Sequence, residues 1–393
     1  MATVADIRKA MDVAYPPYLA EEWDRVGLIC GDPSAQVSHV AIALEATDTV
    51  VDKAIEQGAG MLIVHHPLFL RGTHSVAADD AKGQLVHRLI KNDCALFAAH
   101  TNADAAEGGV NDVLADLLGV SDTTPLSPIT TTFHKWGVMV PTGDADTVKD
   151  AVFAAGAGQL GAYSHCSFEC EGRGQFLPED GAHPTIGSIG HVEKVAETRV
   201  EFVARSDKYE AIVAAIADAH PYEEPAYEYV TAHSGVMGGI GRVGRLIAPT
   251  TLSDFTQHVA DVLPDTVEGV RAAGNPDAII ETVALCSGAG DSFLDRARAV
   301  GADVYVTSDL RHHPADEHLR RGGPALVNTA HWASEFPWCG SVATMMRDDV
   351  DVSAEVLDVR TDPWTIHARK RHEMTPHRGS FPGLLDTSVT PLP

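Results

Sequence analysis

The chain has 393 residues, 45% of them hydrophobic, which is enough for two or three domains with a large core. Its 55 acidic and 29 basic residues give a formal net charge of -26, and we find no stripe of Lys and Arg. Nucleic acid and anionic membrane are therefore excluded as partners, because binding them requires clustered cations. The six cysteines are scattered without a Cys-x-x-Cys pair, and neither a signal-peptide core nor a membrane-spanning stretch is evident. We expect a reduced, cytoplasmic protein.

The first part of the chain, residues 1–129, alternates predicted strands and helices. Apolar runs predict strands at 39–46, 61–66 and 94–100, and amphipathic segments predict helices at 47–58, 81–92 and 108–119. This order is typical of βαβ units in an α/β domain.

The pattern changes over residues 130–235, where we expect a separate insert. Strands are predicted at 134–141, within 163–176, at 199–205 and at 226–230, with helices at 144–156 and 206–220. The order β-α-β-β-α-β is the ferredoxin-like α+β pattern. A glycine-rich segment, residues 235–244, is expected to close this insert.

Residues 236–365 return to the α/β pattern. Strands are predicted at 278–288, 302–309 and 324–330, and a helix at 291–301. "GAGMLIVHHP" and "GADVYVTSDLRHHP" form a faint repeat, so we expect two related α/β halves that form one unit around the insert. Residues 366–393 show no periodicity, and we expect a mobile tail.

Candidate functional side chains lie at or just after the ends of predicted strands. His65 and His66 end a buried strand before Pro67, and neighbouring strand side chains point to opposite faces, so the pair needs either a chain that leaves strand geometry or two acceptors. Asp104 follows another strand, although Asp104 and Glu107 also fit a helix capping box.

The last strand is followed by His331 and Glu335, whose i, i+4 spacing places both on one helical face. A solvated turn is the alternative for this pair. Gly288 and Gly290, between a strand and a helix, fit either an anion cradle or a tight connection.

Together, three imidazoles and two carboxylates at strand ends are a ligand set for one or two divalent ions, with Zn, Fe or Mn suited to these donors. Two ions would explain the adjacent histidines, and Glu335 could bridge them. Purely structural histidines would leave several buried polar groups without partners, so we rank that alternative lower.

Several motifs resemble those of the NGG-interacting factor three family, whose members often carry the name GTP cyclohydrolase I type 2 homologue. They are "EEWDRVGLICG", "IVHHPLF", "AAHTNADAAEGGVND", "HPYEEPAYEY", "SGAGDSF" and "AHWASE". The resemblance extends to about residue 365. Two features depart from the family pattern, namely Ala103 in place of a large aliphatic residue and a second "HHP" at His312-His313.

This resemblance implies a dinuclear centre held by His65, His66, Asp104, His331 and Glu335. It also implies a P-II-like insert and a toroidal homohexamer, a dimer of trimers. The implied activity is that of a metal-dependent hydrolase in which a metal-bound hydroxide attacks a nucleotide-like substrate. A non-catalytic metal-binding regulator or scaffold is the alternative.

A proton donor is also needed for hydrolysis. His100, His312 and His313 lie near predicted strand ends, and we expect one of them to transfer a proton or hold substrate. Surface or supporting histidines are the alternative interpretation of all three.

Overall fold

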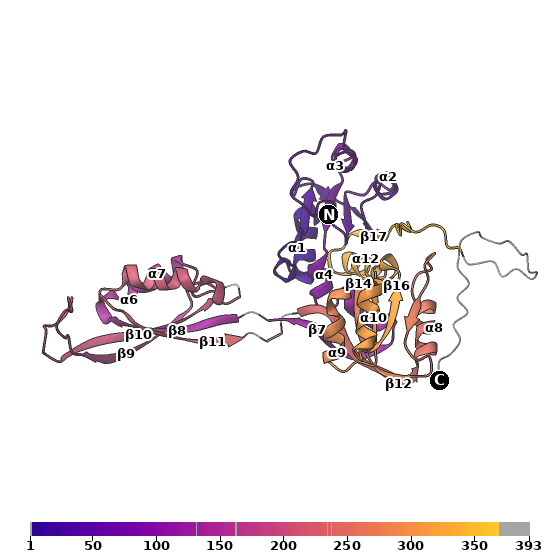
Figure 1. Cartoon of the computed structure of the whole chain (residues 1–393). Coiled ribbons are helices and arrows are strands. Elements are labelled where there is room, and N and C mark those ends of the chain that lie inside the picture. The colour runs from indigo at the N-terminus through magenta and orange to yellow at the C-terminus, as the bar shows by residue number, and fades with distance from the viewer. Residues whose placement is uncertain (1, 131, 162, 234, 237, 369–393) are drawn as a thin grey trace, which may run out of the picture.

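A computed structural model describes residues 2–368 except 131, 162, 234 and 237, and it contains a main body with two sheets and a projecting insert (Figure 1). The expected mobile tail lies, from residue 369 onward, outside the described residues. The prediction of a mixed α/β fold is confirmed. Among the described residues, no helix has the length and apolar character needed to cross a bilayer.

The first sheet of the body has the order β17-β4-β5-β6-β2. Its parallel strands are β17 (Ser353–Val356), β4 (His39–Ala43), β5 (Met61–Val64) and β6 (Ala95–Ala98), while β2 (Gly27–Cys30) is antiparallel. All four residues of β5 are buried, which explains its uninterrupted apolar sequence. The crossover helices are α2 (Asp48–Glu56) and α3 (Ala81–Lys91). Near the N-terminus, α1 (Val4–Ala14) adjoins the small pair β1 (Ala2–Thr3) and β3 (Gln36–Val37).

The second sheet has the order β13-β16-β15-β14-β12-β7. Its strands are β13 (Arg271–Ala273), β16 (Ala325–Thr329), β15 (Val304–Ser308), β14 (Ile279–Ala289), β12 (Gly238–Thr251) and β7 (Val120–Ile129), of which β14, β15 and β16 run parallel. The associated helices are α8 (Leu252–Val262), α9 (Leu294–Ala299), α10 (His312–Arg320) and α12 (Trp338–Asp349).

Three features of this second sheet differ from the sequence prediction. The glycine-rich segment expected to close the insert is the start of β12, a strand of 14 residues. The strand β7 was missed because Pro125 and Pro128 disfavour a central strand, but β7 lies at the sheet edge, where proline is tolerated. The helix α10, which begins at His312, was also not predicted.

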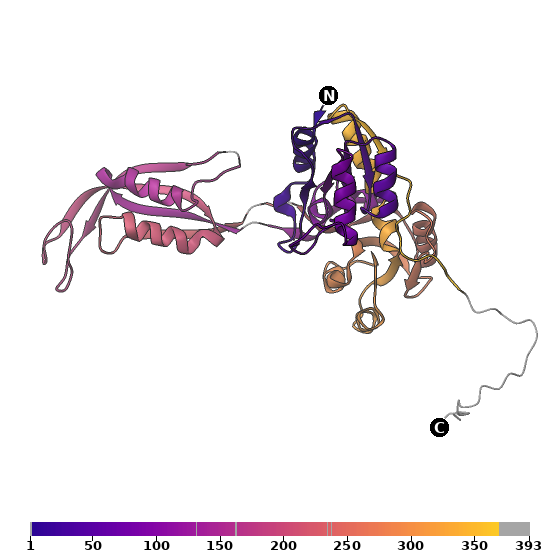
Figure 2. The ribbon, with the colours of Figure 1, turned by 90° about the horizontal axis from the view of Figure 1, so that it is seen from above.

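The insert contains β8 (Thr132–Pro141), α6 (Ala145–Ala154), β9 (Ser167–Phe176), β10 (Glu193–Arg205), α7 (Tyr209–Ala219) and β11 (Ala226–His233). Its antiparallel sheet has the order β11-β8-β10-β9, and both helices lie on one face of it (Figures 1 and 2). Trp136, Val200, Phe202 and Ile212 belong to a core that is separate from the core of the body. The insert therefore has the packing of an independent unit that projects from the body.

Short helices lie between the two body sheets and complete their common core. They are α4 (Thr101–Ala105), α5 (Val110–Leu117) and α11 (His331–Glu335). A single cluster of buried side chains includes Ile63 of the first sheet, Val306 of the second sheet and Leu114 of α5 between them. The carboxyl ends of β5, β6, β15 and β16 thereby reach one polar centre.

Candidate metal centre

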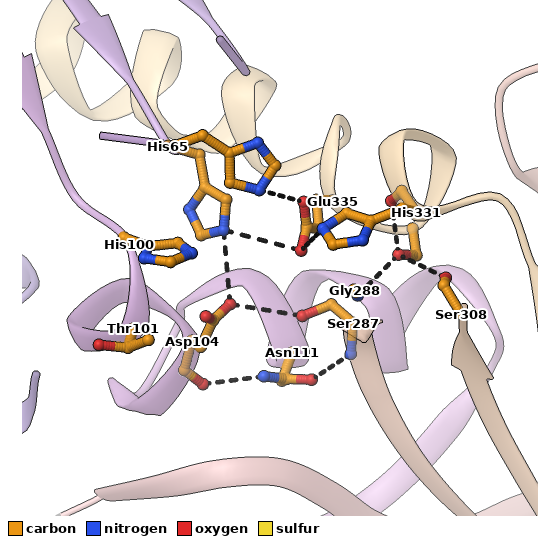
Figure 3. A network of polar contacts seen from close by, with 12 residues as sticks. His65, His100, Thr101, Asp104, Asn111, Ser287, Gly288, Ser308, His331 and Glu335 are labelled. Atoms are coloured by element: carbon orange, nitrogen blue, oxygen red, sulfur yellow. Dashed lines mark hydrogen bonds and ion pairs between the residues drawn. The ribbon is translucent and has the colours of Figure 1, made fainter. Parts of the chain in front are cut away.

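The adjacent histidines lie where β5 ends. The backbone amides of His65 and His66 both donate to the carbonyl of Leu44, at 3.1 and 2.9 Å. The chain thus leaves strand geometry immediately after Val64, and the two imidazole centroids are 4.9 Å apart. This departure allows neighbouring side chains to face the same centre (Figure 3).

Asp104 reaches the centre from α4, which follows β6. The capping-box interpretation of Asp104 is wrong, since Asp104 lies inside α4 and the next helix, α5, has Gly109 as its N-cap. Asn111 fixes the segment by donating from its amide to the Asp104 carbonyl at 2.9 Å. On the other side, Ser287 Oγ donates to Asp104 Oδ1 at 3.4 Å.

His331 and Glu335 come from the single turn of α11. As their spacing predicted, they share one face, with His331 Nε2 3.1 Å from Glu335 Oε1. The other carboxylate oxygen of Glu335 is 3.0 Å from His66 Nε2. His65 Nε2 lies 3.8 Å from Glu335 Oε1 and 3.7 Å from Asp104 Oδ1. The structure therefore brings together the five side chains expected as ligands.

Each imidazole of the centre is oriented through its Nδ1 atom. His65 Nδ1 meets the Ala99 carbonyl at 2.8 Å, and the other partners are carboxylates: Glu45 for His66 at 3.0 Å, Asp309 for His331 at 2.7 Å, and Asp24 for His100 at 2.9 Å. Such an acceptor holds the proton on Nδ1 and leaves the Nε2 lone pair free for a metal.

Two buried atoms at the centre lack hydrogen bonds, namely His65 Nε2 and Glu335 Oε2. Glu335 Oε2 lies 3.0 Å from His66 Nε2, close enough for an ion pair, but the angles at these atoms do not form a hydrogen bond. Unsatisfied buried polar atoms are costly, and a cation would satisfy both. Two groups of ligand atoms lie mutually within 4.8 Å, one of His66, His331 and Glu335 and the other of His65, His66 and His100. The residues present therefore fit a metal site.

Burial and charge shift the ionisation of these side chains in opposite directions. Burial opposes a positive charge on His66 and His331, but the neighbouring carboxylates outweigh this effect. Glu335 and Glu45 raise the pKa of His66 to about 10. Glu335 and Asp309 raise the pKa of His331 to about 11. Burial lowers the pKa of His65 to about 3. Burial and the neighbouring Glu335 raise the pKa of Asp104 to about 7. Burial alone would raise the pKa of Glu335, but His331 and His66 hold it well below its usual value.

Three acidic residues of the centre were missed by sequence reasoning about single motifs. Glu45 and Asp309 follow strands β4 and β15, so the strand-end rule that found the ligands also marks them. Asp24, which also accepts from Thr101 N and Oγ1, carries only the signal of its place in "EEWDR". These residues orient the histidines and do not contact the centre of the cluster themselves.

The three histidines expected to assist catalysis lie in different places. His100 is in the cluster, its centroid 5.1 Å from that of His65. His312 and His313 are exposed at the start of α10, and neither has a polar contact with the cluster in the described part of the chain. Their catalytic role stays a prediction.

The Gly288 amide is not available for the anion cradle that the sequence offered as one interpretation of this turn. The Gly288 amide already donates to Ser334 Oγ at 3.0 Å, and a helix of only six residues, α9, follows. Gly288 has a positive φ of 60°, and a Cβ there would overlap Glu335 Oε1. This glycine therefore makes room for the carboxylate.

Comparison with known proteins assigns this α/β protein to a family. Residues 2–363 match the family model Duf34/NIF3 (NGG1p interacting factor 3), and the chain belongs to this family. A Mycobacterium tuberculosis protein named "GTP cyclohydrolase 1 type 2 homolog" is 50% identical over 92% of this chain and 97% of its own.

Solved structures agree with this assignment. A Bacillus cereus protein related to NIF3 is 35% identical with a TM-score of 0.63, covering 93% of this chain and 99% of its own. The Staphylococcus aureus protein SA1388 is 28% identical with a TM-score of 0.71 and the same coverage.

Proposed function

We propose that this protein is a metal-dependent hydrolase with two divalent ions, Zn, Fe or Mn, in one centre built by its two α/β halves. The observation that carries the proposal is the convergence of three imidazole Nε2 atoms, those of His65, His66 and His331, on the carboxylates of Glu335 and Asp104, with each imidazole oriented by an acceptor at Nδ1. The ions would be held by His65, His66, Asp104, His331 and Glu335. Glu335 could serve both ions, because its two carboxylate oxygens lie near different histidines.

When bound, such ions supply an activated water and a Lewis acid that polarises the bond under attack. The protein provides an acid-base group beside them. His100 directs its Nε2 toward the cluster while Asp24 holds Nδ1, the arrangement by which a carboxylate fixes the tautomer of a general base. We assign proton transfer to His100 Nε2.

The expected substrate class is nucleotide-like, and the cavity at the centre supports this. It has a volume of about 380 Å³, and Trp23, Ile240 and Phe293 line it together with His100, Asp104 and Glu335. Trp23 is 56% exposed, so one part of its indole is available to a planar ring. No Lys or Arg lines this cavity among the described residues, which favours entry of the heterocycle rather than the phosphates. The name of the Mycobacterium tuberculosis relative, which refers to GTP, supports the same class.

The assembly and location are further parts of this proposal. We infer a homohexamer, a toroid formed as a dimer of trimers, with a P-II-like insert, and a cytoplasmic location. Family membership supports the assembly, and scattered free cysteines support a reducing compartment. Light scattering on the purified protein should give six times the mass of the chain, and a monomer would contradict the inference.

Elemental analysis of freshly purified protein tests the centre. We expect about two ions per chain, fewer in His66→Ala, and no change in His258→Ala, a control that removes an exposed histidine of α8. A chain that takes up no Zn, Mn or Fe after reconstitution would contradict the proposal.

Nucleotide titration of the metal-loaded protein separates the hydrolase from the regulator. GTP, ATP and simple phosphoesters are screened for turnover and for a shift in melting temperature, since a ligand of the native state stabilises it. Two ions with neither turnover nor a shift would favour a metal-binding regulatory or scaffold protein instead.

A further inference from the structure

A second cavity, with a volume of about 720 Å³, lies in the insert. The ends of β9 and α7 that border it lie at the end of the insert away from the body (Figure 1). It lies between the β9–β10 connection, residues 177–192, and the α7–β11 connection, residues 220–225. Thr185 Oγ1 donates to the Pro221 carbonyl at 2.7 Å, and His183 N donates to Glu223 Oε2 at 2.9 Å. The two connections are thus fastened together, and the volume is that of a small-molecule pocket.

The cavity contains a buried carboxylate with no cationic partner. Glu197 of β10 is 9% exposed, and its Oε1 accepts from Tyr222 OH at 3.0 Å. Its Oε2 has no hydrogen-bond donor, and no Lys, Arg or His pairs with it, among the described residues. A counterion stabilises a carboxylate in such a partly dry setting, so a cation that enters the cavity would gain an ion pair with Glu197.

The surroundings of Glu197 also favour a cation. The lining includes the carboxylates of Glu179, Asp180, Glu223 and Glu224, and no Lys, Arg or His among the described residues. A Cβ at Gly174 would overlap the Glu197 carboxylate, so the neighbouring strand leaves space for this group.

Two aromatic rings supply the apolar part of the wall. Phe176 and Tyr222 lie edge to face with centroids 5.5 Å apart. Such rings attract an ammonium group through their π faces and bury the methylene groups attached to it.

Among the described residues, no three of these carboxylates come close enough together to enclose a metal ion. Within the described residues, the only groups of three metal-ligating side chains with atoms mutually within 4.8 Å are those at the metal centre. An extended organic cation can reach separated carboxylates, whereas a metal ion cannot. We propose that this cavity of the insert binds an aliphatic polyamine, with one ammonium group on Glu197 and its methylene chain against Phe176 and Tyr222. The proposal is independent of the hydrolase assignment.

Calorimetric titration of the full chain with spermidine at about 0.15 M salt, which screens surface attraction, tests this proposal. We expect one saturable site per chain and about tenfold weaker binding in Glu197→Gln, because a charge-assisted hydrogen bond is lost. Glu224→Gln, which removes a lining carboxylate without hydrogen bonds, should weaken binding with the fold intact. If Glu197→Gln does not fold, the weaker binding expected for Glu224→Gln still tests the proposal.

Glu171→Gln is the matched control, because Glu171 is an exposed carboxylate of β9 outside the cavity. Its binding should equal that of the unmodified protein. Equal weakening in the control would assign the binding to the acidic surface and overturn the proposal. Absence of saturable binding, or displacement of spermidine by Mg²⁺ at equal concentration, would also overturn it.

Discussion

His66 and Glu335, separated by 268 intervening residues, meet with His66 Nε2 3.0 Å from Glu335 Oε2. His66 follows β5 of the first sheet, and Glu335 is the last residue of α11, which follows β16 of the second sheet. The centre therefore forms only when both sheets have folded against each other. The five predictions below test this centre and the structure around it.

Gly288→Ala should reduce metal binding sharply, because the added Cβ would overlap the carboxylate of Glu335. Gly301→Ala is the matched control, since Gly301 also has a positive φ, 72°, but open space around its Cα. Both variants carry the backbone strain of about 1 kcal/mol expected for Ala at positive φ. Metal content measured on both should fall only for Gly288→Ala, and equal loss would mean that backbone strain is responsible.

Asp309→Asn should weaken metal affinity about 10–100-fold, the usual effect of removing a carboxylate that orients a metal-binding histidine. Asp309 Oδ2 accepts from His331 Nδ1 at 2.7 Å. A competition titration with a chromophoric chelator measures the affinity. The control is Asp295→Asn, because Asp295 is an exposed aspartate of α9, and its metal affinity should equal that of the unmodified chain. An unchanged affinity in Asp309→Asn would contradict the orienting role of Asp309.

Metal binding should release protons at neutral pH. Without metal, the pKa of His66 is about 10 and that of His331 about 11, so both are protonated at pH 7, whereas a metal requires neutral imidazole. Zinc titrations in buffers of different ionisation enthalpy should therefore report at least about two protons released per chain, with a further fraction from Asp104, whose pKa is about 7. Zinc binding without proton release would show that these imidazoles are neutral in the free protein.

The same raised pKa values fix the sign of the stability change with pH. His66 and His331 bind protons more tightly in the folded than in the unfolded protein, so their protonation stabilises the metal-free folded state. This contribution is fully present below a pH of about 6.5, the pKa of histidine in the unfolded chain. That contribution declines as the pH rises toward the folded values of about 10 and about 11. Denaturant unfolding of metal-free protein across this range should show the decline, and His66→Ala should reduce it.

Arg242→Met should lower the free energy of unfolding by about 3–5 kcal/mol, because it leaves Asp112 without its buried partner. Arg242 is 3% exposed, and its guanidinium donates to Asp112 and to the carbonyls of Gly239, Gly241 and Ala106. Arg245→Met, three residues along the same strand, removes an exposed pair with Glu281 and should cost less than about 1 kcal/mol. Urea unfolding curves give both values, and similar values would refute the role of burial.

The sequence was informative where local chemistry determines structure. The apolar run before His65 and the i, i+4 spacing of His331 and Glu335 predicted the strand end and the helical face that the structure contains. Asp104 was ambiguous because a capping box and a short helix before Gly109 share the same local pattern. The long-range hydrogen bonds of Asn111, to Asp104 and from Ser287, decide between them.

Other features depend on partners that are distant in sequence. The strand-end rule marks Glu45, and the motif "EEWDR" contains Asp24. The histidine that each carboxylate orients, His66 or His100, is evident only in the folded structure. The strand β7 contains two prolines and becomes a strand because β12 offers it an edge. The hydrogen bonds between these carboxylates and histidines, and the pairing of β7 with β12, join segments distant in sequence. The spacing of residues within one segment therefore cannot predict them.

The insert departs from and returns to the body at adjacent points. Ile129 of β7 is paired with Gly238 of β12, and the whole segment between them has its own core. In the topology of the second sheet, the roughly one hundred residues of the insert occupy the place of a long hairpin loop between β7 and β12. The entropic cost of closing a loop increases only slowly with its length. Replacing residues 130–237 by a short turn should preserve the register of β7 and β12, so the two parts of the protein are free to diverge in sequence at different rates.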